Sequence, residues 1–242
     1  MKRLLLSSLY MLLASWSAVA ADLPTKANAF KPRDIPTTGC GTYMTLGAAG
    51  GAGSISNSPV PGASVVQGEI GAGFGYTCAM SPTSLWFAEG SIWLANLNGS
   101  TNGFSLSGPL DVMIRAGYGN SAITSILGSI GFGGIAVPSL PVLPIGVTSG
   151  TPVPYAALAG HFQDVSSQFI DANTGNVFTA NKVWEAAPAF QIGAWSRLSN
   201  GTVADVYGEY QVRTSGACFG GGLSGLCPGM GNVYRGVVSF KF

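Results

Sequence analysis

Apolar and polar side chains alternate along most of the chain after residue 39, in runs separated by clusters of Gly, Pro, Asn and Ser. Successive side chains of a β-strand point to opposite faces, so this alternation predicts strands that meet two different environments. The Gly, Pro, Asn and Ser clusters mark the strand ends. The pattern predicts eight strands, at about residues 40–50, 65–78, 85–97, 104–118, from 122 onward, 183–198, 202–213 and 232–242.

The two faces of these strands differ in charge. In six of the strands every charged residue falls on one face, and the other face carries Ile, Val, Leu, Phe, Tyr and Trp. Lys or Arg on the lipid face of a barrel costs about 2–4 kcal/mol near mid-membrane, so contact with lipid explains the segregation. The charged face is expected to line a lumen with a network of Glu69, Glu89, Asp111, Arg115, Glu185, Arg197, Asp205, Glu209, Arg213, Arg235 and Lys241.

Aromatic residues on the apolar face are expected to form the two interfacial girdles that are typical of membrane barrels. Five of them lie near the ends of strands that the pattern places on the periplasmic side: Tyr76, Trp86, Tyr118, Phe240 and Phe242. Three lie near the opposite ends: Trp184, Tyr210 and Tyr234.

The breaks between strands alternate in length. MSPTS, GN and SNG are short, and the other connections are longer. Outer-membrane barrels have short periplasmic turns and longer extracellular loops. The sequence therefore predicts an all-β fold, an eight-stranded antiparallel up-and-down transmembrane β-barrel spanning residues 40–242. Its final strand, GVVSFKF, pairs with the first and leaves no free edge in lipid.

One stretch carries a weaker signal, because no charged residue occurs between Arg115 and Asp164. SAITSILGSIGFGGIAV can be a strand that continues into a loop, or a helical span of about seventeen residues. Its glycines and the following PSLPVLPIG argue against a stable helix. We expect residues of about 135–181 to form one long extracellular loop.

The N-terminal residues have the layout of an export signal. Lys2 and Arg3 precede an apolar stretch and the small residues Ala18-Val19-Ala20, which predicts a signal peptide over residues 1–21. An uncleaved anchor helix is the alternative. Residues 22–39 contain three prolines and mixed charges, and we expect them to form an extended periplasmic segment.

Composition agrees with a membrane barrel. Only 9% of the residues are charged, against about 25% in an ordinary soluble domain. The formal net charge of +1 gives no basic patch for nucleic acid. The chain has one histidine and no C-x-x-C pair, so no metal, cofactor or catalytic site is expected.

The four cysteines belong to an exported chain, where disulfides are the usual outcome. Cys40 begins the first strand and Cys78 ends the second, so both lie at the periplasmic end of an antiparallel pair. Cys218 and Cys227 share one extracellular loop. Two disulfides, 40–78 and 218–227, are predicted, with four free buried thiols as the alternative.

The export signal, the mature start ADLPTK, the first-strand segment CGTYMTLGAAGGAG and the terminal Phe242 together resemble a known family. They are similar to the small opacity-type, porin-like outer-membrane proteins of alphaproteobacteria. The resemblance implies an eight-stranded, integral outer-membrane barrel that is displayed on the cell surface. It also implies that Phe242 is the signal read by the barrel assembly machinery.

Three functions follow from these patterns. A structural or surface-display barrel with a charge-paired, largely plugged lumen suits the six acids and five bases of the predicted network. A small porin-like channel for passive diffusion is the alternative, because several inward positions are glycine. A lipid-modifying enzyme is a remote third, with His161 and the nearby Ser166 and Ser167 as base and nucleophile.

The prediction of an outer-membrane barrel also indicates its partners. They are outer-membrane lipid and lipopolysaccharide, together with the barrel assembly machinery during biogenesis. No nucleic acid and no cofactor are expected to bind. The protein is expected to be a monomer or a weak oligomer.

Overall fold

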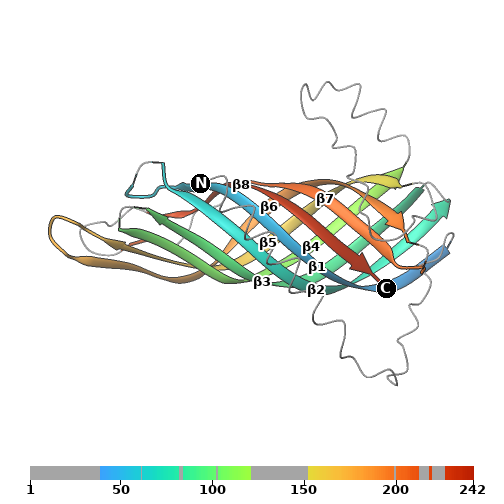
Figure 1. The fold of residues 1–242 in the computed structure, drawn as a ribbon, viewed down its shortest axis with the longest axis horizontal. Coiled ribbons are helices and arrows are strands. Elements are labelled where there is room, and N and C mark those ends of the chain that lie inside the picture. Colours follow the sequence, from blue (N-terminus) through green and yellow to red (C-terminus); the bar gives the residue numbers. More distant parts are fainter. Residues whose placement is uncertain are drawn as a thin grey trace, which may run out of the picture. The chain divides into compact units, whose positions relative to one another are not determined.

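The chain folds into one closed antiparallel barrel in which each strand pairs with the next and β8 returns to β1 (Figure 1). The computed structural model describes residues 39–60, 62–81, 84–101, 103–120, 152–198, 200–212, 218–219 and 227–242. The strands are β1 (Gly39–Ser56), β2 (Ser64–Ser81), β3 (Ser84–Thr101), β4 (Phe104–Asn120), β5 (Val153–Ile170), β6 (Val177–Arg197), β7 (Val203–Gln211) and β8 (Gly229–Lys241). The predicted fold class, an eight-stranded up-and-down barrel, is confirmed.

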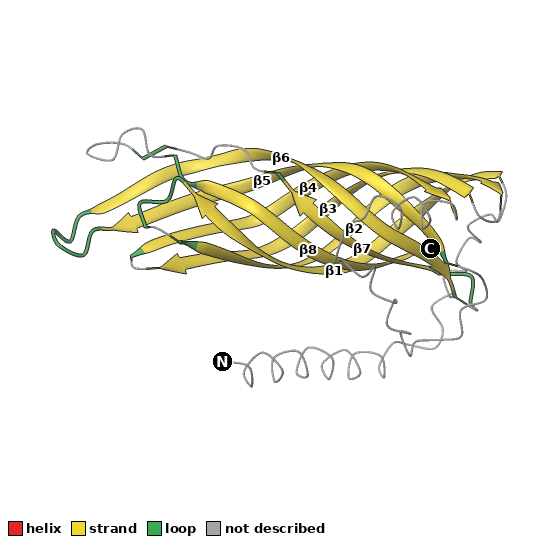
Figure 2. Ribbon diagram, turned by 90° about the horizontal axis from the view of Figure 1, so that it is seen from above, coloured by secondary structure: helices red, strands yellow, loops and turns green. Residues whose placement is uncertain are grey.

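Every described element is a strand, a loop or a turn (Figure 2). Within the described ranges no helix is long and apolar enough to cross a membrane. By its contacts the chain separates into two units, Met1–Pro32 and Arg33–Phe242. The barrel belongs to the second unit. The predicted signal peptide and most of the predicted periplasmic segment lie outside the described residues.

The barrel closes through the final strand. β8 runs antiparallel to β1, from Gly229 opposite Ser56 to Lys241 opposite Thr45. Beyond this ladder, Phe242 and Met44 exchange two backbone hydrogen bonds of 3.0 Å. A closed ladder leaves no row of unpaired N–H and C=O groups along this seam.

The two ends of the barrel differ. We call the end with the first residue of β1 and the last of β8 the base, and the opposite end the crown. At the base, residues 82–83 join β2 to β3. A tight turn joins β6 to β7, with Leu198 N–H donating to the Thr202 carbonyl at 2.8 Å and Gly201 at a φ of 87°. Only glycine takes that φ without steric cost.

Two sequence predictions for the middle of the chain are wrong. The segment 135–181 is not one long loop, because β5 occupies Val153–Ile170 and β6 begins at Val177, with a six-residue turn between them. The tight GN break is also wrong: Asn120 ends β4, and residues 121–152 connect it to β5 at the base. The start predicted near Ala122 lies outside the described residues. β5 carries no Lys, Arg or Glu, so the segregation of charge that marked the other strands was absent.

The β5–β6 turn at the crown is organised by Asp171. Its carboxylate accepts hydrogen bonds from the backbone N–H of Asn173 at 2.9 Å and from the hydroxyl of Thr174 at 2.7 Å. Gly175 has a φ of 70°, and its N–H donates to the Asp171 carbonyl at 2.7 Å. The Asn173 N–H and the Thr174 hydroxyl stabilise the ionised carboxylate and lower the pKa of Asp171.

This turn gives a first prediction. Because the pKa of Asp171 is lowered by folding, its stabilising contribution is present at neutral pH and is lost as the pH falls through that pKa. In an NMR titration the Asn173 amide resonance should move with a midpoint below that of an ordinary aspartate. The variant Asp171→Ala should abolish the shift. A midpoint at or above the ordinary value would contradict the prediction.

Candidate functional site

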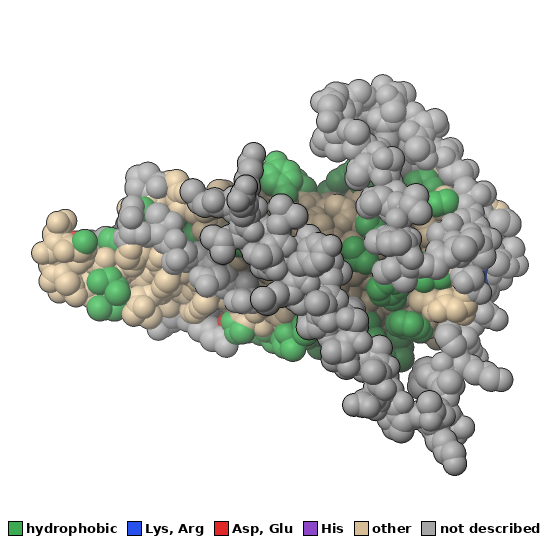
Figure 3. Space-filling model, in the orientation of Figure 1, with side chains coloured by type: hydrophobic (Ala, Val, Ile, Leu, Met, Phe, Trp, Pro, Cys, Tyr) green, Lys and Arg blue, Asp and Glu red, His purple; other side chains and the backbone are tan. Residues whose placement is uncertain are grey.

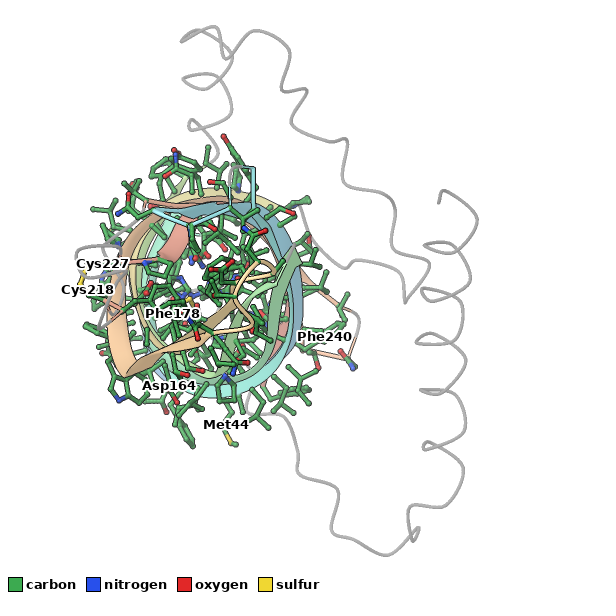
Figure 4. All side chains as sticks on the ribbon, turned by 90° about the vertical axis from the view of Figure 1, so that its left-hand side faces the viewer. Met44, Asp164, Phe178, Cys218, Cys227 and Phe240 are labelled. Atoms are coloured by element: carbon green, nitrogen blue, oxygen red, sulfur yellow. A yellow bond between two sulfur atoms is a disulfide. The ribbon has the colours of Figure 1, made fainter. Side chains whose placement is uncertain are left out.

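The lumen is the candidate site, and its side chains form three regions between crown and base. Side chains project into the barrel in a view along its axis (Figure 4). At the crown lies an apolar group, here the crown cluster: Ile55, Ala63, Val65, Phe104, Leu106, Val165, Ala180, Phe219 and Val233. Toward the base lies the basal cluster: Tyr43, Leu85, Phe87, Trp93, Met113, Tyr155, Ala157, Ala159, Ala189, Trp195, Val203, Tyr207 and Val237. Charged and amide side chains form the third region.

A first ion-pair network lies among the rings of the basal cluster. The Arg115 guanidinium donates to both oxygens of Glu89, from Nε at 3.1 Å and from Nη2 at 3.0 Å. Arg115 Nη2 also lies 2.7 Å from Asp205 Oδ2. Lys241 Nζ contacts the same two carboxylates, at 2.5 Å for Glu89 Oε2 and 3.2 Å for Asp205 Oδ2. Two cations and two carboxylates therefore neutralise one another.

Aromatic side chains complete this basal network. The Tyr155 hydroxyl donates to Asp205 Oδ1 at 2.7 Å, and the Tyr43 hydroxyl donates to Glu89 Oε2 at 3.1 Å. The Arg115 guanidinium carbon lies 4.5 Å from the centre of the Tyr207 ring. The Tyr155 contact gives Asp205 Oδ1 a donor, the Tyr43 contact adds one at Glu89, and the Tyr207 ring lies against a buried cation.

A second network surrounds Arg235. Its guanidinium pairs with Glu69, lies 3.3 Å from Asp111 Oδ2 through Nη1, and lies 3.1 Å from Glu209 Oε1 through Nε. The guanidinium also lies 5.2 Å from the centre of the Trp93 ring. Here three carboxylates face one arginine, which leaves an excess of two negative charges, so a further positive charge would halve the excess.

His161 is placed to supply that charge. Its Nδ1 lies 2.8 Å from Asp111 Oδ2 and its Nε2 lies 3.1 Å from Glu209 Oε2. A carboxylate can only accept, so both contacts become hydrogen bonds when both ring nitrogens carry protons, as in the imidazolium form. The sequence predicts a surface loop around His161, and this prediction is wrong because His161 lies in β5. In β5 (Val153–Ile170) the alternation of side chains turns His161 toward the lumen.

Glutamine side chains link and extend the two networks. The sequence prediction did not include them, because it considered only charged residues. Gln191 Oε1 accepts from Arg115 Nη1 at 3.3 Å, and its Nε2 donates to Glu209 Oε2 at 2.5 Å. Gln211 Nε2 donates to Glu209 Oε1 at 2.9 Å, and Gln67 donates to Glu69. The available signal was the alternation within each strand, which places these glutamines on the same face as the charged residues.

The structure brings together most of the predicted network. Eight of its residues belong to the two networks: Glu69, Glu89, Asp111, Arg115, Asp205, Glu209, Arg235 and Lys241. Glu185 is buried on β6 and Arg197 is half-buried at the base end of β6, each with interactions of its own. Arg213 lies outside the described residues.

The inward glycines do not leave open space. A Cβ atom added to Gly71 would overlap the Trp93 ring, and one added to Gly75 would overlap Tyr43. At Gly117 and Gly193 the space is taken by Phe87 and by Tyr207 with Tyr155. At Gly73 the added Cβ would meet the neighbouring strand at Gly90 and Ser91. The missing glycine side chains are thus matched by large neighbours.

The outer wall is apolar. Leu158 is 70% exposed, Phe74 69% and Tyr234 68%, and hydrophobic side chains are spread over the face seen in Figure 3. Every strand Asp, Glu, Lys or Arg whose side chain the structure describes is buried or half-buried. Asp164, which lies opposite outward-facing Trp184, is only 3% exposed and has interactions of its own.

The predicted girdle residues occupy opposite halves of their strands. Tyr76, Trp86, Tyr118 and Phe240 lie in the base halves, followed by Phe242 next to the end of β8. Trp184, Tyr210 and Tyr234 lie in the crown halves. The Tyr76 and Trp86 rings are 5.6 Å apart, and those of Tyr210 and Tyr234 are 5.0 Å apart. Figure 4 shows Met44 and Phe240 on the outside of the wall.

Both predicted disulfides are confirmed, and no cysteine is free. Cys40 and Cys78 are direct cross-strand partners at the base. Cys218 and Cys227 join within the β7–β8 connection (Figure 4). Phe219, next to Cys218, is buried in the crown cluster, so this connection contributes a side chain to the closure of the crown.

The residues proposed for catalysis are kept apart. Ser167 lies six residues from His161 on the same strand, which corresponds to about 20 Å. The Ser166 hydroxyl lies 2.9 Å from that of Ser107 and is exposed. No base and nucleophile are therefore paired here. The described part of the chain also holds no group of His, Cys, Asp and Glu suited to a metal ion.

Comparison with known proteins adds little to this geometry. No family model matches the chain, and no curated protein matches it. Among solved structures, the crystal structure of Neisserial surface protein A (NspA) aligns with a TM-score of 0.38 and 13% sequence identity. The alignment covers 84% of this chain and 96% of that chain.

Removing the cation at the centre of the second network should destabilise the barrel strongly. Arg235→Met leaves Asp111 and Glu209 paired with His161 and removes the ion pair of Glu69, and breaking such a buried pair costs about 3–5 kcal/mol. Urea unfolding in lipid vesicles, followed by tryptophan fluorescence, measures the change. Adding Glu69→Gln to Arg235→Met should recover part of the loss.

The matched control for this experiment is Val238→Leu, which changes an outward-facing, half-buried side chain of β8 outside the network. Such a position should alter the free energy of unfolding by only about 0.5 kcal/mol. Equal stability of Arg235→Met and Val238→Leu would show that the network does not hold the barrel together.

Proposed function

We propose that the protein is an integral outer-membrane β-barrel with a structural or surface-display role and a closed, charge-paired lumen. The observation that carries the proposal is the distribution of polarity across the wall. Apart from Asp164, the charged side chains that the structure describes in the strands turn inward, and large apolar side chains turn outward. A barrel that works in water needs a polar exterior, whereas lipid requires an apolar one.

The exterior would be costly in water. Outward-facing Val66, Ile70, Ile92, Leu94 and Ile114 are each more than half exposed. Soluble monomers rarely present contiguous apolar surface of more than a few hundred Å². In a bilayer the same side chains meet acyl chains, and the closed ladder leaves no backbone group of the seam unpaired.

Aromatic side chains in the base and crown halves support the same proposal. Tyr and Trp favour membrane interfaces because the ring is apolar and the hydroxyl or indole N–H is polar. We place the base in the periplasm and the crown outside the cell, in line with the predicted export signal. The crown hairpins, including the ordered β5–β6 turn at Asp171, would then form the displayed surface.

A closed lumen is supported by the filling of its glycine positions. Aromatic rings from neighbouring strands occupy the space above Gly71, Gly75, Gly117 and Gly193. The crown cluster adds an apolar layer on the crown side, and the rings of the basal cluster surround the first ion-pair network. These features favour a plugged barrel over the porin-like alternative, whose argument rested on the same glycines.

Several finer expectations belong to this proposal. They are membership of the opacity-type family, contact with lipopolysaccharide, recognition of Phe242 by the assembly machinery, and a monomeric or weakly associated state. A non-enzymatic role belongs to the same proposal, and in it His161 serves the ion-pair network through Asp111 and Glu209.

Single-channel recording in planar bilayers tests the proposal. A heat-dependent shift in gel mobility first verifies that the refolded barrel has formed and inserted. The wild-type protein should give no discrete conductance steps, because rings and paired charges block the lumen. Reproducible steps from the wild-type protein would reject the closed lumen and favour a diffusion pore.

A variant with the base unplugged gives the positive control. Phe87→Ala combined with Trp195→Ala removes two rings whose centres lie 5.0 Å apart in the basal cluster. The variant should show discrete conductance steps where the wild-type protein shows none, provided that it retains the heat-dependent gel shift.

A further inference from the structure

The outer wall is not uniformly bulky, and one shallow hollow lies on it near the base. It has a volume of about 400 Å³ and follows the ends of β4 and β5. Its outward-facing lining is apolar and comprises Ala116 and Tyr118 from β4, Ala156 and Leu158 from β5, and Phe190 from β6.

The strand register explains the hollow. Ala116 lies opposite Leu158, and one step nearer the base Tyr118 lies opposite Ala156. The two small residues therefore sit on a diagonal between two large ones. Phe190, opposite Leu158 on the far side of β5, forms the next wall. Leu158 is 70% exposed, so it stands out from the surface as a ridge.

A polar group borders the hollow on the base side. The Tyr118 hydroxyl lies 3.2 Å from the hydroxyl of Ser84 and accepts a hydrogen bond of 3.0 Å from Asn120 Nδ2. Ser84 and Asn120 are direct cross-strand partners at the ends of β3 and β4. The surface thus changes from apolar to polar within one residue pair, with Tyr118 belonging to both parts.

We propose that this hollow is a binding site for one acyl chain of a phospholipid in the periplasmic leaflet. The chain lies over Ala116 and Ala156, and its ester and headgroup lie beside Ser84, Tyr118 and Asn120. This inference rests on the proposed function, because it requires the outer wall to lie in a membrane with the base in the periplasm.

The dimensions and chemistry favour a lipid over a second copy of the chain. A stable protein interface buries about 800 Å² on each partner, and this hollow is bounded by single side chains of three adjacent strands. An acyl chain needs only a narrow apolar trough that continues into the surrounding apolar wall. The amphipathic Tyr118 matches the level at which acyl chain and headgroup meet.

Native mass spectrometry of the refolded full-length protein tests the site, with dioleoyl phosphatidylethanolamine added to detergent micelles as the probe. The wild-type protein should retain one lipid molecule after the micelle is removed. Ala156→Leu fills the hollow, and the retained fraction should fall at least fivefold. Ala72→Leu enlarges an outward-facing alanine on β2 and serves as the matched control, with retention unchanged.

The possible results separate this inference from the proposed function. Equal retention by the wild-type protein and Ala156→Leu would overturn the site, as would a dimer mass that disappears only in Ala156→Leu. Cross-linking of residues 121–151 to Ala156→Cys in place of lipid would also overturn it. A heat-shifted barrel that inserts into vesicles keeps the proposed function in each of these cases, and failure to insert rejects both.

Discussion

The structure depends on neutralising charge inside a closed wall. The five carboxylates of the two networks are buried, and each contacts Arg115, Arg235, Lys241 or His161. An unpaired buried charge costs several kcal/mol, so the strands that supply the acids and those that supply the bases must hold a single register. A shift of one strand by one residue would turn its lumen charges to the outer face of the wall.

The packing around these charges follows the same constraint. Glycines on β2, β4 and β6 admit rings from neighbouring strands, and those rings lie against the guanidinium and ammonium groups. A cation over a ring face loses less on leaving water than a cation among aliphatic side chains. Small and large residues are therefore distributed so that the lumen is filled without leaving the charges in an apolar surrounding.

Much of the fold could be predicted from the sequence, because the alternation of apolar and polar residues and the segregation of charge both follow from a wall with a polar inner face and an apolar outer face. The prediction failed for the strand whose sequence shows neither the alternation nor the segregation of charge. β5 has apolar or small residues on both faces near the base, as at Ala156, Ala157 and Leu158, and so it resembled a loop continuing an uncharged stretch. His161 was missed for this reason alone. The glutamines that join the networks carry no charge, and only the folded register shows which carboxylates they reach.

The two long cations of β8 have a consequence for biogenesis. Arg235 and Lys241 contact carboxylates on β2, β3, β4 and β7, all of which precede them in the chain. A polypeptide cut short before β8 would lack one strand of the wall, and its five network carboxylates would face only Arg115 and His161. Closure of the β1–β8 seam and neutralisation of the buried carboxylates therefore both require β8.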